Sequence, residues 1–203
     1  MKKTCAAAIA MATAFLSTGA QAAAGDVIVR MRAIMVAPNE GSRTGALSTL
    51  GAKVNNDVVP EVDFTYMLTN NIGAELIAAT SLHKISSGGT TIGKSYVLPP
   101  TLTLQYHLAP EAAIRPYVGV GFNYTIFYSE KSKGPIDGSD LALKDSIGFA
   151  GQVGVDIDLS KKFFLNLDLK YIDMKAKAKL NGAGIGKMDL NPLVFGIGFG
   201  TRF

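Results

Sequence analysis

Apolar and polar residues alternate along most of this chain, and the alternation recurs in separate segments. In the clearest segment, positions 96–108, Leu102, Leu104 and Leu108 fall on one side and Thr103 and Gln105 on the other. An alternation with a period of two residues predicts a β-strand that has one apolar and one polar face. The same pattern predicts eight strands in all, at positions 27–36, 59–68, 72–83, 96–108, 118–128, 146–157, 163–171 and 193–203.

The links between these segments alternate between long and short. Long polar links are expected at 38–57, 84–95, 129–144 and 173–189, and short turns at 69–71, 109–113 and 159–162. This alternation is typical of outer-membrane barrels, in which long loops face outward and short turns face the periplasm. The pattern therefore predicts an all-β fold, an eight-stranded antiparallel up-and-down transmembrane β-barrel with both termini in the periplasm. Within the last long link, the glycine-rich stretch 182–187 is expected to be a flexible loop.

The charged residues indicate which face of the barrel meets lipid. Arg30, Arg32, Asp63 and Glu75 all fall opposite an apolar row. Charged side chains are costly against lipid, whereas a small lumen allows them to pair with one another. A soluble barrel would turn its apolar rows inward, so the charges favour a membrane barrel whose apolar rows face lipid.

The last predicted strand also fits a membrane barrel. From position 193 its odd positions are mostly apolar, its even positions are mostly glycine, and it ends in Phe203. An aromatic residue at the end of a strand fits the girdle at the membrane interface. We also expect Phe203 to be the signal by which the outer-membrane assembly machinery recognises the chain.

The N-terminus has the features of a secretory signal peptide. Two lysines precede an apolar run at 6–16, and small residues continue to Ala22. This arrangement predicts cleavage after Ala22 or Ala24. We therefore expect residues 1–22 to be a signal peptide and residues 23–203 to form a single transmembrane β-barrel domain.

Composition limits the remaining possibilities. Of the 203 residues, 48% are apolar and 18% are charged, and the net charge of +4 falls to +2 when Lys2 and Lys3 leave with the signal peptide. No cluster of basic residues suggests nucleic-acid binding. Cys5 is the only cysteine and lies within the signal peptide, so the mature chain has no disulfide or thiol chemistry.

Several short motifs resemble those of a known family. They include Leu98-Pro-Pro-Thr, Arg115-Pro-Tyr-Val-Gly and Asn191-Pro-Leu-Val-Phe. These motifs resemble the OmpW family of small outer-membrane barrels, and the resemblance covers essentially the whole mature chain. Two departures are the absence of tryptophan and a threonine, Thr201, where the family usually has tyrosine. The resemblance implies an eight-stranded barrel that lets small hydrophobic molecules cross the outer leaflet and leave sideways through the wall.

The inward-facing residues fall into two sets along the barrel axis. Those toward the outer side are apolar, and we expect them to form a hydrophobic lumen: Ile34, Val36, Val59, Ile77, Val97, Pro99, Phe127, Ile172, Pro192 and Val194. Those toward the periplasm are charged, and we expect them to form a polar plug: Arg30, Asp63, Glu75, Asp156, Asp168 and Arg202. An eight-stranded barrel is wide enough for side chains or one small ligand, so a continuous water pore is not expected.

Two functional interpretations remain open. In the first, the barrel is a funnel in which small hydrophobic solutes enter from outside, stop at the plug and leave through the wall. Pro99 and Pro100 are candidates for this lateral exit, because two consecutive prolines should interrupt strand pairing. In the second, the apolar residues simply pack together, and the protein is a non-transporting envelope anchor or a surface receptor.

An enzymatic role has little support in the sequence. His83 lies near Ser81, but no nucleophile motif accompanies this pair. We therefore expect no catalytic residues, no metal site and no cofactor. The expected partners are outer-membrane lipid and lipopolysaccharide, small hydrophobic solutes and the outer-membrane assembly machinery.

Overall fold

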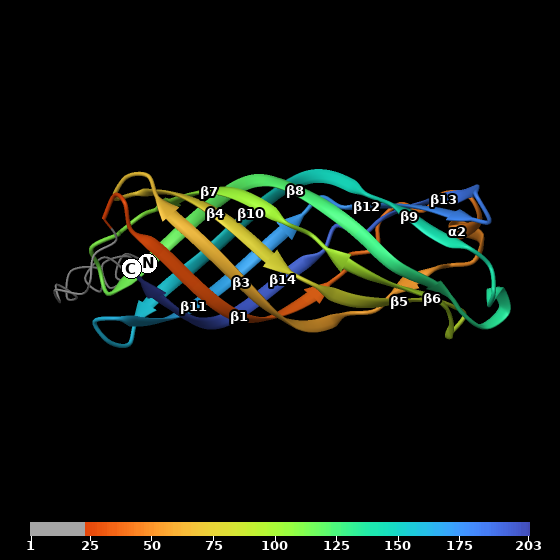
Figure 1. Ribbon diagram of the computed structural model, residues 1–203, viewed down its shortest axis with the longest axis horizontal. Coiled ribbons are helices and arrows are strands. Elements are labelled where there is room, and N and C mark those ends of the chain that lie inside the picture. Colours follow the sequence, from red (N-terminus) through yellow and green to blue (C-terminus); the bar gives the residue numbers. More distant parts are fainter. Residues whose placement is uncertain (1–22) are drawn as a thin grey trace, which may run out of the picture.

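The chain folds into an elongated all-β barrel, with both described ends of the chain at the same end of the molecule (Figure 1). The computed structural model describes residues 23–203. The predicted signal peptide, residues 1–22, with Cys5, lies outside the described residues. No helix in the part of the chain that the structure describes is long and apolar enough to cross a membrane.

Eight antiparallel strands form the closed wall, which confirms the predicted fold. In the order in which they pair around the barrel they are β1 (Val27–Ala37), β3 (Asp57–Met67), β4 (Ile72–Ala79), β7 (Thr101–His107), β8 (Ile114–Ser132), β10 (Ser146–Asp158), β11 (Phe163–Ile172) and β14 (Leu193–Arg202). β14 closes the barrel by pairing with β1 from Ile28↔Arg202 to Ala37↔Leu193. The last strand therefore meets the first, as the sequence pattern predicts.

The wall is extended at one end by the long links. We call this the extension end, and the opposite end, with the short turns and both termini, the turn end (Figure 1). The extension end contains α2 (Ala46–Thr49), β2 (Lys53–Val54), β5 (Ser81–Ser87), β6 (Thr90–Leu98), the 3-10 helix η2 (Gly134–Ile136), β9 (Leu141–Lys144), β12 (Lys175–Leu180) and β13 (Ala183–Asp189). β5 and β6 form one hairpin, and β12 and β13 form another that also pairs with β9.

The expectation of a flexible loop at 182–187 is wrong, because residues 183–187 belong to β13 and Gly182 to the tight turn before it. β12 and β13 pair as far as Leu180↔Ala183, so that only Asn181 and Gly182 make the turn. Both turn residues have positive φ angles, 50° and 81°. Asn-Gly is the preferred sequence for this type of two-residue turn, since both positions need left-handed backbone.

The outer face of the wall is an apolar belt. Val120, Ile147 and Phe149 are 70%, 76% and 67% exposed, whereas the inward Arg30 and Asp63 are completely buried. Toward the extension end, the rings of Tyr96 and Tyr128 stack on the outer face with centroids 5.3 Å apart. An apolar belt bordered by aromatic residues is the surface that a membrane barrel presents to lipid.

Candidate functional site: an apolar cavity above a charged plug

An apolar cavity of about 350 Å³ occupies the extension half of the lumen. All ten residues of the predicted hydrophobic lumen line it: Ile34, Val36, Val59, Ile77, Val97, Pro99, Phe127, Ile172, Pro192 and Val194. The lining continues to exposed residues near the tips of the extension, including Leu50 and Pro135, so the cavity opens at that end. Its floor includes Glu61 and Lys170.

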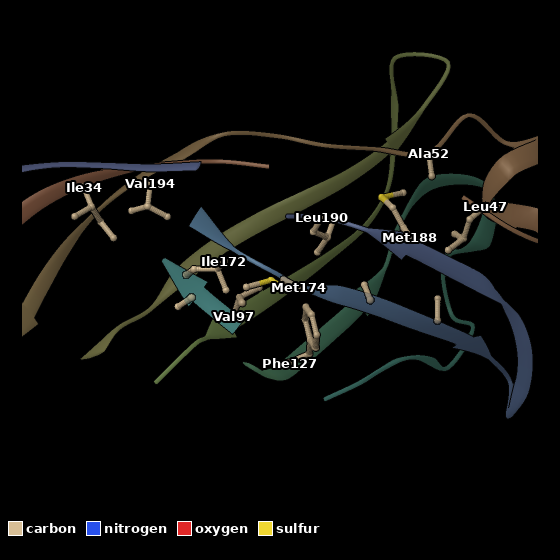
Figure 2. Close-up of a cluster of buried hydrophobic side chains, with 13 residues drawn as sticks. Ile34, Leu47, Ala52, Val97, Phe127, Ile172, Met174, Met188, Leu190 and Val194 are labelled. Carbon is tan, nitrogen blue, oxygen red and sulfur yellow. The ribbon is translucent and has the colours of Figure 1, made fainter. Parts of the chain in front are cut away.

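The extension supplies part of the lining that the sequence analysis did not identify. Leu47, Met174, Met188 and Leu190 are all buried in the same apolar cluster as Ile34 (Figure 2). Figure 2 shows this cluster running from Ile34 and Val194 to Leu47 and Ala52. After Tyr171, the outward positions of the chain carry lysines instead of apolar residues. This change marks where the missed part of the lining from Met174 to Leu190 begins.

A small polar group interrupts the apolar lining. Ser81, His83 and Ser95 all line the cavity and are nearly inaccessible to solvent. The His83 Nδ1 atom lies 2.8 Å from the Asn55 carbonyl oxygen, and Nε2 lies 3.0 Å from the Ser81 hydroxyl. Because a carbonyl can only accept, Nδ1 donates to it, and Nε2 of a neutral ring then accepts from Ser81. The Ser81–His83 pair thus gives the cavity a hydrogen-bonding spot in an otherwise apolar wall.

Below the cavity, two arginines of β1 organise the charged plug. The Arg30 guanidinium binds both oxygens of Asp156, at 3.2 and 2.9 Å, and donates to Asp63 at 3.1 Å. Arg32 binds Glu61 at 2.8 Å and also contacts Asp63. The alternation of β1 sends both arginines inward, and their guanidinium groups then reach carboxylates on several strands.

The remaining plug residues link this network to the floor of the cavity. Lys170 Nζ lies 2.8 Å from both Glu61 and Asp168. Glu75, which is fully buried, accepts a hydrogen bond from Thr103 at 2.7 Å. Since these side chains are almost inaccessible to solvent, the lumen is closed at this level. Of the six predicted plug residues, five belong to this network: Arg30, Asp63, Glu75, Asp156 and Asp168.

Arg202, the sixth predicted plug residue, lies in a separate layer at the turn end. Its nearest carboxylate is Asp158, at 3.6 Å, and its guanidinium lies over the Phe164 ring, 5.3 Å from the centroid. Asp158 is held mainly by Arg115, which donates two hydrogen bonds to it at 2.7 and 2.5 Å. The sequence analysis did not identify Phe164 or Arg115 as part of the plug.

Glycines on the inner face of β14 make room for the plug. The space beside Gly198 is taken by Arg32 and by the backbone of Met31, and the space beside Gly200 by the Phe164 ring. A Cβ atom at Gly200 would lie 2.2 Å from this ring. These glycines therefore accommodate large neighbouring side chains, and the space beside them is filled.

Strand pairing is interrupted at Pro99 and Pro100. The β4–β7 ladder ends at Ile77↔Thr101, and the β5–β6 ladder begins at Ser81↔Val97. The two ladders have the same register, so Ala79 faces Pro99 across a short stretch without ladder pairs. On the other side, the Pro100 carbonyl accepts a hydrogen bond from Tyr124 N at 3.0 Å. We call the unpaired stretch between 78–80 and 98–100 the pairing gap.

The chain matches proteins of known family along its length. The family model described as "OmpW family" matches residues 23–203. Outer membrane protein W of Escherichia coli (strain K12) is 39% identical over 213 residues, covering 100% of both chains. The crystal structure of the outer membrane protein OprG from Pseudomonas aeruginosa is similar, with a TM-score of 0.80, 31% identity and coverage of 92% of this chain and 98% of that chain.

A solution structure of the E. coli protein agrees with this comparison. The E. coli Outer Membrane Protein W structure matches with a TM-score of 0.63 and 39% identity, over 89% of this chain and 99% of that chain. These matches confirm the resemblance that the Leu98-Pro-Pro-Thr and Arg115-Pro-Tyr motifs indicate, and with it the location in the bacterial outer membrane. The chain therefore belongs to the OmpW family of outer-membrane β-barrel proteins.

Proposed function

We propose that this barrel passes small hydrophobic molecules across the outer leaflet of the outer membrane. In this proposal a solute enters at the extension end, which faces outward, occupies the apolar cavity and leaves through the pairing gap into the membrane. The turn end then faces the periplasm, as in other barrels with short periplasmic turns.

The observation that carries the proposal is the apolar cavity above a closed plug. The cavity of about 350 Å³ is lined mostly by apolar side chains and is open at the extension end. The free energy of a hydrophobic solute falls when the solute moves from water into such a site. A charged or strongly polar solute would lose its hydration there without compensating partners.

The closed plug supports a lateral exit rather than a route along the barrel axis. Arg30, Asp63 and Glu75 are completely buried and Arg30 pairs with both carboxylates, so a solute that continued downward would have to break this network. Pro99 lines the cavity and borders the pairing gap. Proline cannot donate a backbone hydrogen bond, which weakens the wall at this level.

The cavity can be tested by filling it. The double substitution Ala176→Phe/Ala178→Phe places two rings on buried, inward positions of β12, where Ala178 lines the cavity. We expect uptake of a fluorescent hydrophobic solute into lipopolysaccharide-containing vesicles to fall about tenfold or more, which corresponds to roughly 1.4 kcal/mol on the barrier to passage. The matched control, Ala33→Phe/Ala74→Phe, puts two rings on the lipid side of the wall and should leave uptake unchanged.

Two results would contradict the proposed function. If the filled cavity passes the solute at the wild-type rate, the cavity is not the route. If vesicles with the wild-type protein take up hydrophobic solute no faster than empty vesicles, the envelope anchor or surface receptor becomes the better interpretation. A charged solute of similar size serves as the second control and should not enter in either case.

A further inference from the structure

Three lysines stand side by side on the outer face of the extension. Lys84 of β5 is in register with Lys94 of β6, and Lys94 is in register with Lys131 of β8. Lys84 and Lys131 are exposed and Lys94 is half-buried. Neighbouring strands are about 4.8 Å apart, so the three side chains leave the sheet as one short row.

This lysine row has no counter-charge within the described protein. Between residues 23 and 203, none of the three lysines forms an ion pair, and the nearby acids hold backbone groups instead. Glu130 accepts from the Leu143 N–H at 3.1 Å, and Asp57 accepts from the Leu82 N–H at 2.8 Å. Like charges directly opposite each other destabilise a sheet. The row is therefore a local cost to the free protein, which an external anion would remove.

The position of the lysine row along the barrel axis indicates in which layer of the membrane that anion lies. Toward the wall, the next outward in-register positions are Leu82, Tyr96 and Tyr128, two residues away on β5 and β6 and three on β8, where the register shifts by one residue. The stacked Tyr96 and Tyr128 rings are exposed on the outer face, as expected of the girdle at the edge of the hydrocarbon layer. Two residues along a strand span about 6.6 Å. That distance places the lysines in the polar headgroup layer, which is roughly 5–8 Å thick on each side of the hydrocarbon.

We propose that Lys84, Lys94 and Lys131 bind the phosphate groups of lipopolysaccharide in the outer leaflet. The outward end of an outer-membrane barrel is surrounded by this lipid. A phosphate monoester carries a charge of about −1.5 to −2 at neutral pH and three acceptor oxygens, so one group can satisfy two adjacent lysines. The flexible lysine stems pack along the sheet while their ammonium groups reach the headgroup layer.

A second lysine row does not share this position. Lys144, Lys177 and Lys187 are in register across β9, β12 and β13 and line a shallow hollow. The neighbour of Lys177 toward the wall is Lys175, which pairs with Asp173 at 3.3 Å instead of standing above an aromatic pair. We therefore assign the lipid site to the row above Tyr96 and Tyr128.

The test compares two double variants that remove the same charge. Lys84→Gln/Lys131→Gln removes the two exposed members of the row, and Lys161→Gln/Lys162→Gln removes two exposed lysines at the turn end. The folded proteins, in uncharged detergent micelles, are titrated with intact lipopolysaccharide and with the same lipopolysaccharide after removal of its phosphates. Each basic residue near an anionic surface contributes a factor of about five, so we expect the first variant to bind intact lipopolysaccharide about tenfold or more weakly.

The expected pattern has three further parts. The turn-end control should bind intact lipopolysaccharide like the wild type. The wild type should bind the intact form more tightly than the dephosphorylated form. Inorganic phosphate at millimolar concentration should not compete with intact lipopolysaccharide. Equal affinity for both forms of the lipid, or an equal loss in both variants, would overturn the site. Competition by inorganic phosphate would show a general phosphate site and overturn its assignment to lipid.

Thermal stability provides a readout that separates binding from damage to the fold. Without lipopolysaccharide, Lys84→Gln/Lys131→Gln should melt at the same temperature as the wild type or higher, because repulsion around Lys94 is relieved. With lipopolysaccharide, the wild type should gain more stability than the variant. A variant that is less stable than the wild type without the lipid would show that the lysines support the fold itself and would overturn the proposal.

Discussion

Among single residues, Arg32 makes an unusually large number of contacts in the plug. It lies within 4 Å of four carboxylates, those of Glu61, Asp63, Glu75 and Asp168, and is 3% exposed. Arg32→Met keeps much of the length of the side chain but removes its charge from among these acids. Leaving buried charges without their partner costs about 3–5 kcal/mol. We expect a loss of this size in the free energy of unfolding, measured by urea titration in micelles.

A surface arginine provides the control for this prediction. Arg43 pairs with Glu40 at the extension end, where both side chains are partly exposed. Exposed ion pairs contribute about 0–1 kcal/mol, so Arg43→Met should have little effect on unfolding. Similar small losses in both variants would show that the plug carboxylates do not depend on Arg32.

The alternation of the sequence was sufficient to assign residues to the lumen but not to pair them. Period two predicts that Arg30 and Asp156 both face inward. It does not predict that they bind each other, because strands far apart in the sequence meet only when the barrel closes. The prediction misses Tyr117 for another reason. Its hydroxyl donates to Asp168 at 2.9 Å, but Tyr117 lies just before the strand predicted at 118–128, so the alternation assigns it to neither face.

Among the elements, β4 to β7 contain the feature on which the lateral exit depends. The register of the two flanking ladders places Ala79 opposite Pro99. Paired positions flank Ala79 and Pro99 two residues away on both sides, at Ile77↔Thr101 and Ser81↔Val97, and paired antiparallel residues are about 4.5–5.5 Å apart, a distance that a disulfide can span. Ala79→Cys/Pro99→Cys should therefore lock the pairing gap when oxidised. We expect about a tenfold loss of hydrophobic-solute uptake, equivalent to about 1.4 kcal/mol.

The same experiment contains its own control, because residues 23–203 have no other cysteine. Reduction of the locked protein should restore uptake. A second lock, Ala74→Cys/Leu104→Cys, joins an in-register pair of β4 and β7 outside the gap and should not affect uptake in either redox state. If the oxidised gap lock passes solute as fast as the reduced form, the solute leaves elsewhere.

The alternation of apolar and polar residues predicts the strands of the wall. The hairpins of the extension are indicated instead by the residues at their turns. Asn181-Gly182 and Gly88-Gly89 are both two-residue turns with positive φ angles, and they connect the β12–β13 and β5–β6 hairpins. Asn-Gly and Gly-Gly are strong hairpin signals. The sequence pattern predicts links for most of these strands, because lysine, serine and glycine dilute the apolar alternation there.

For the molecule as a whole, the alternation of side-chain direction along the strands determines which residues form the lipid belt, the plug and the cavity. Along β8 as far as Tyr128, the outward residues form part of the lipid belt, while the inward residues meet the plug at Tyr117 and the cavity at Phe127. At Ser129, which has a positive φ angle, the register shifts by one residue and the alternation reverses, so that Lys131 is exposed. The register of each strand therefore sets the lipid belt, the plug and the cavity together. A one-residue slip would place charges in lipid and apolar side chains in the plug.

Closure of the barrel also places Phe203 at an exposed position beside the first strand. Its backbone N–H and carbonyl both bond to Val27 at 3.0 Å, while its side chain is 78% exposed. Because the ring contributes little to packing, Phe203→Gly should fold in detergent like the wild type, within about 0.5 kcal/mol for an exposed substitution. If the ring is the signal for the assembly machinery, the same variant should accumulate less in the outer membrane of cells, and Phe203→Tyr should restore it. Wild-type insertion of Phe203→Gly in cells would show that the machinery reads another part of the chain, and equal losses in detergent and in cells would show that Phe203 acts through folding alone.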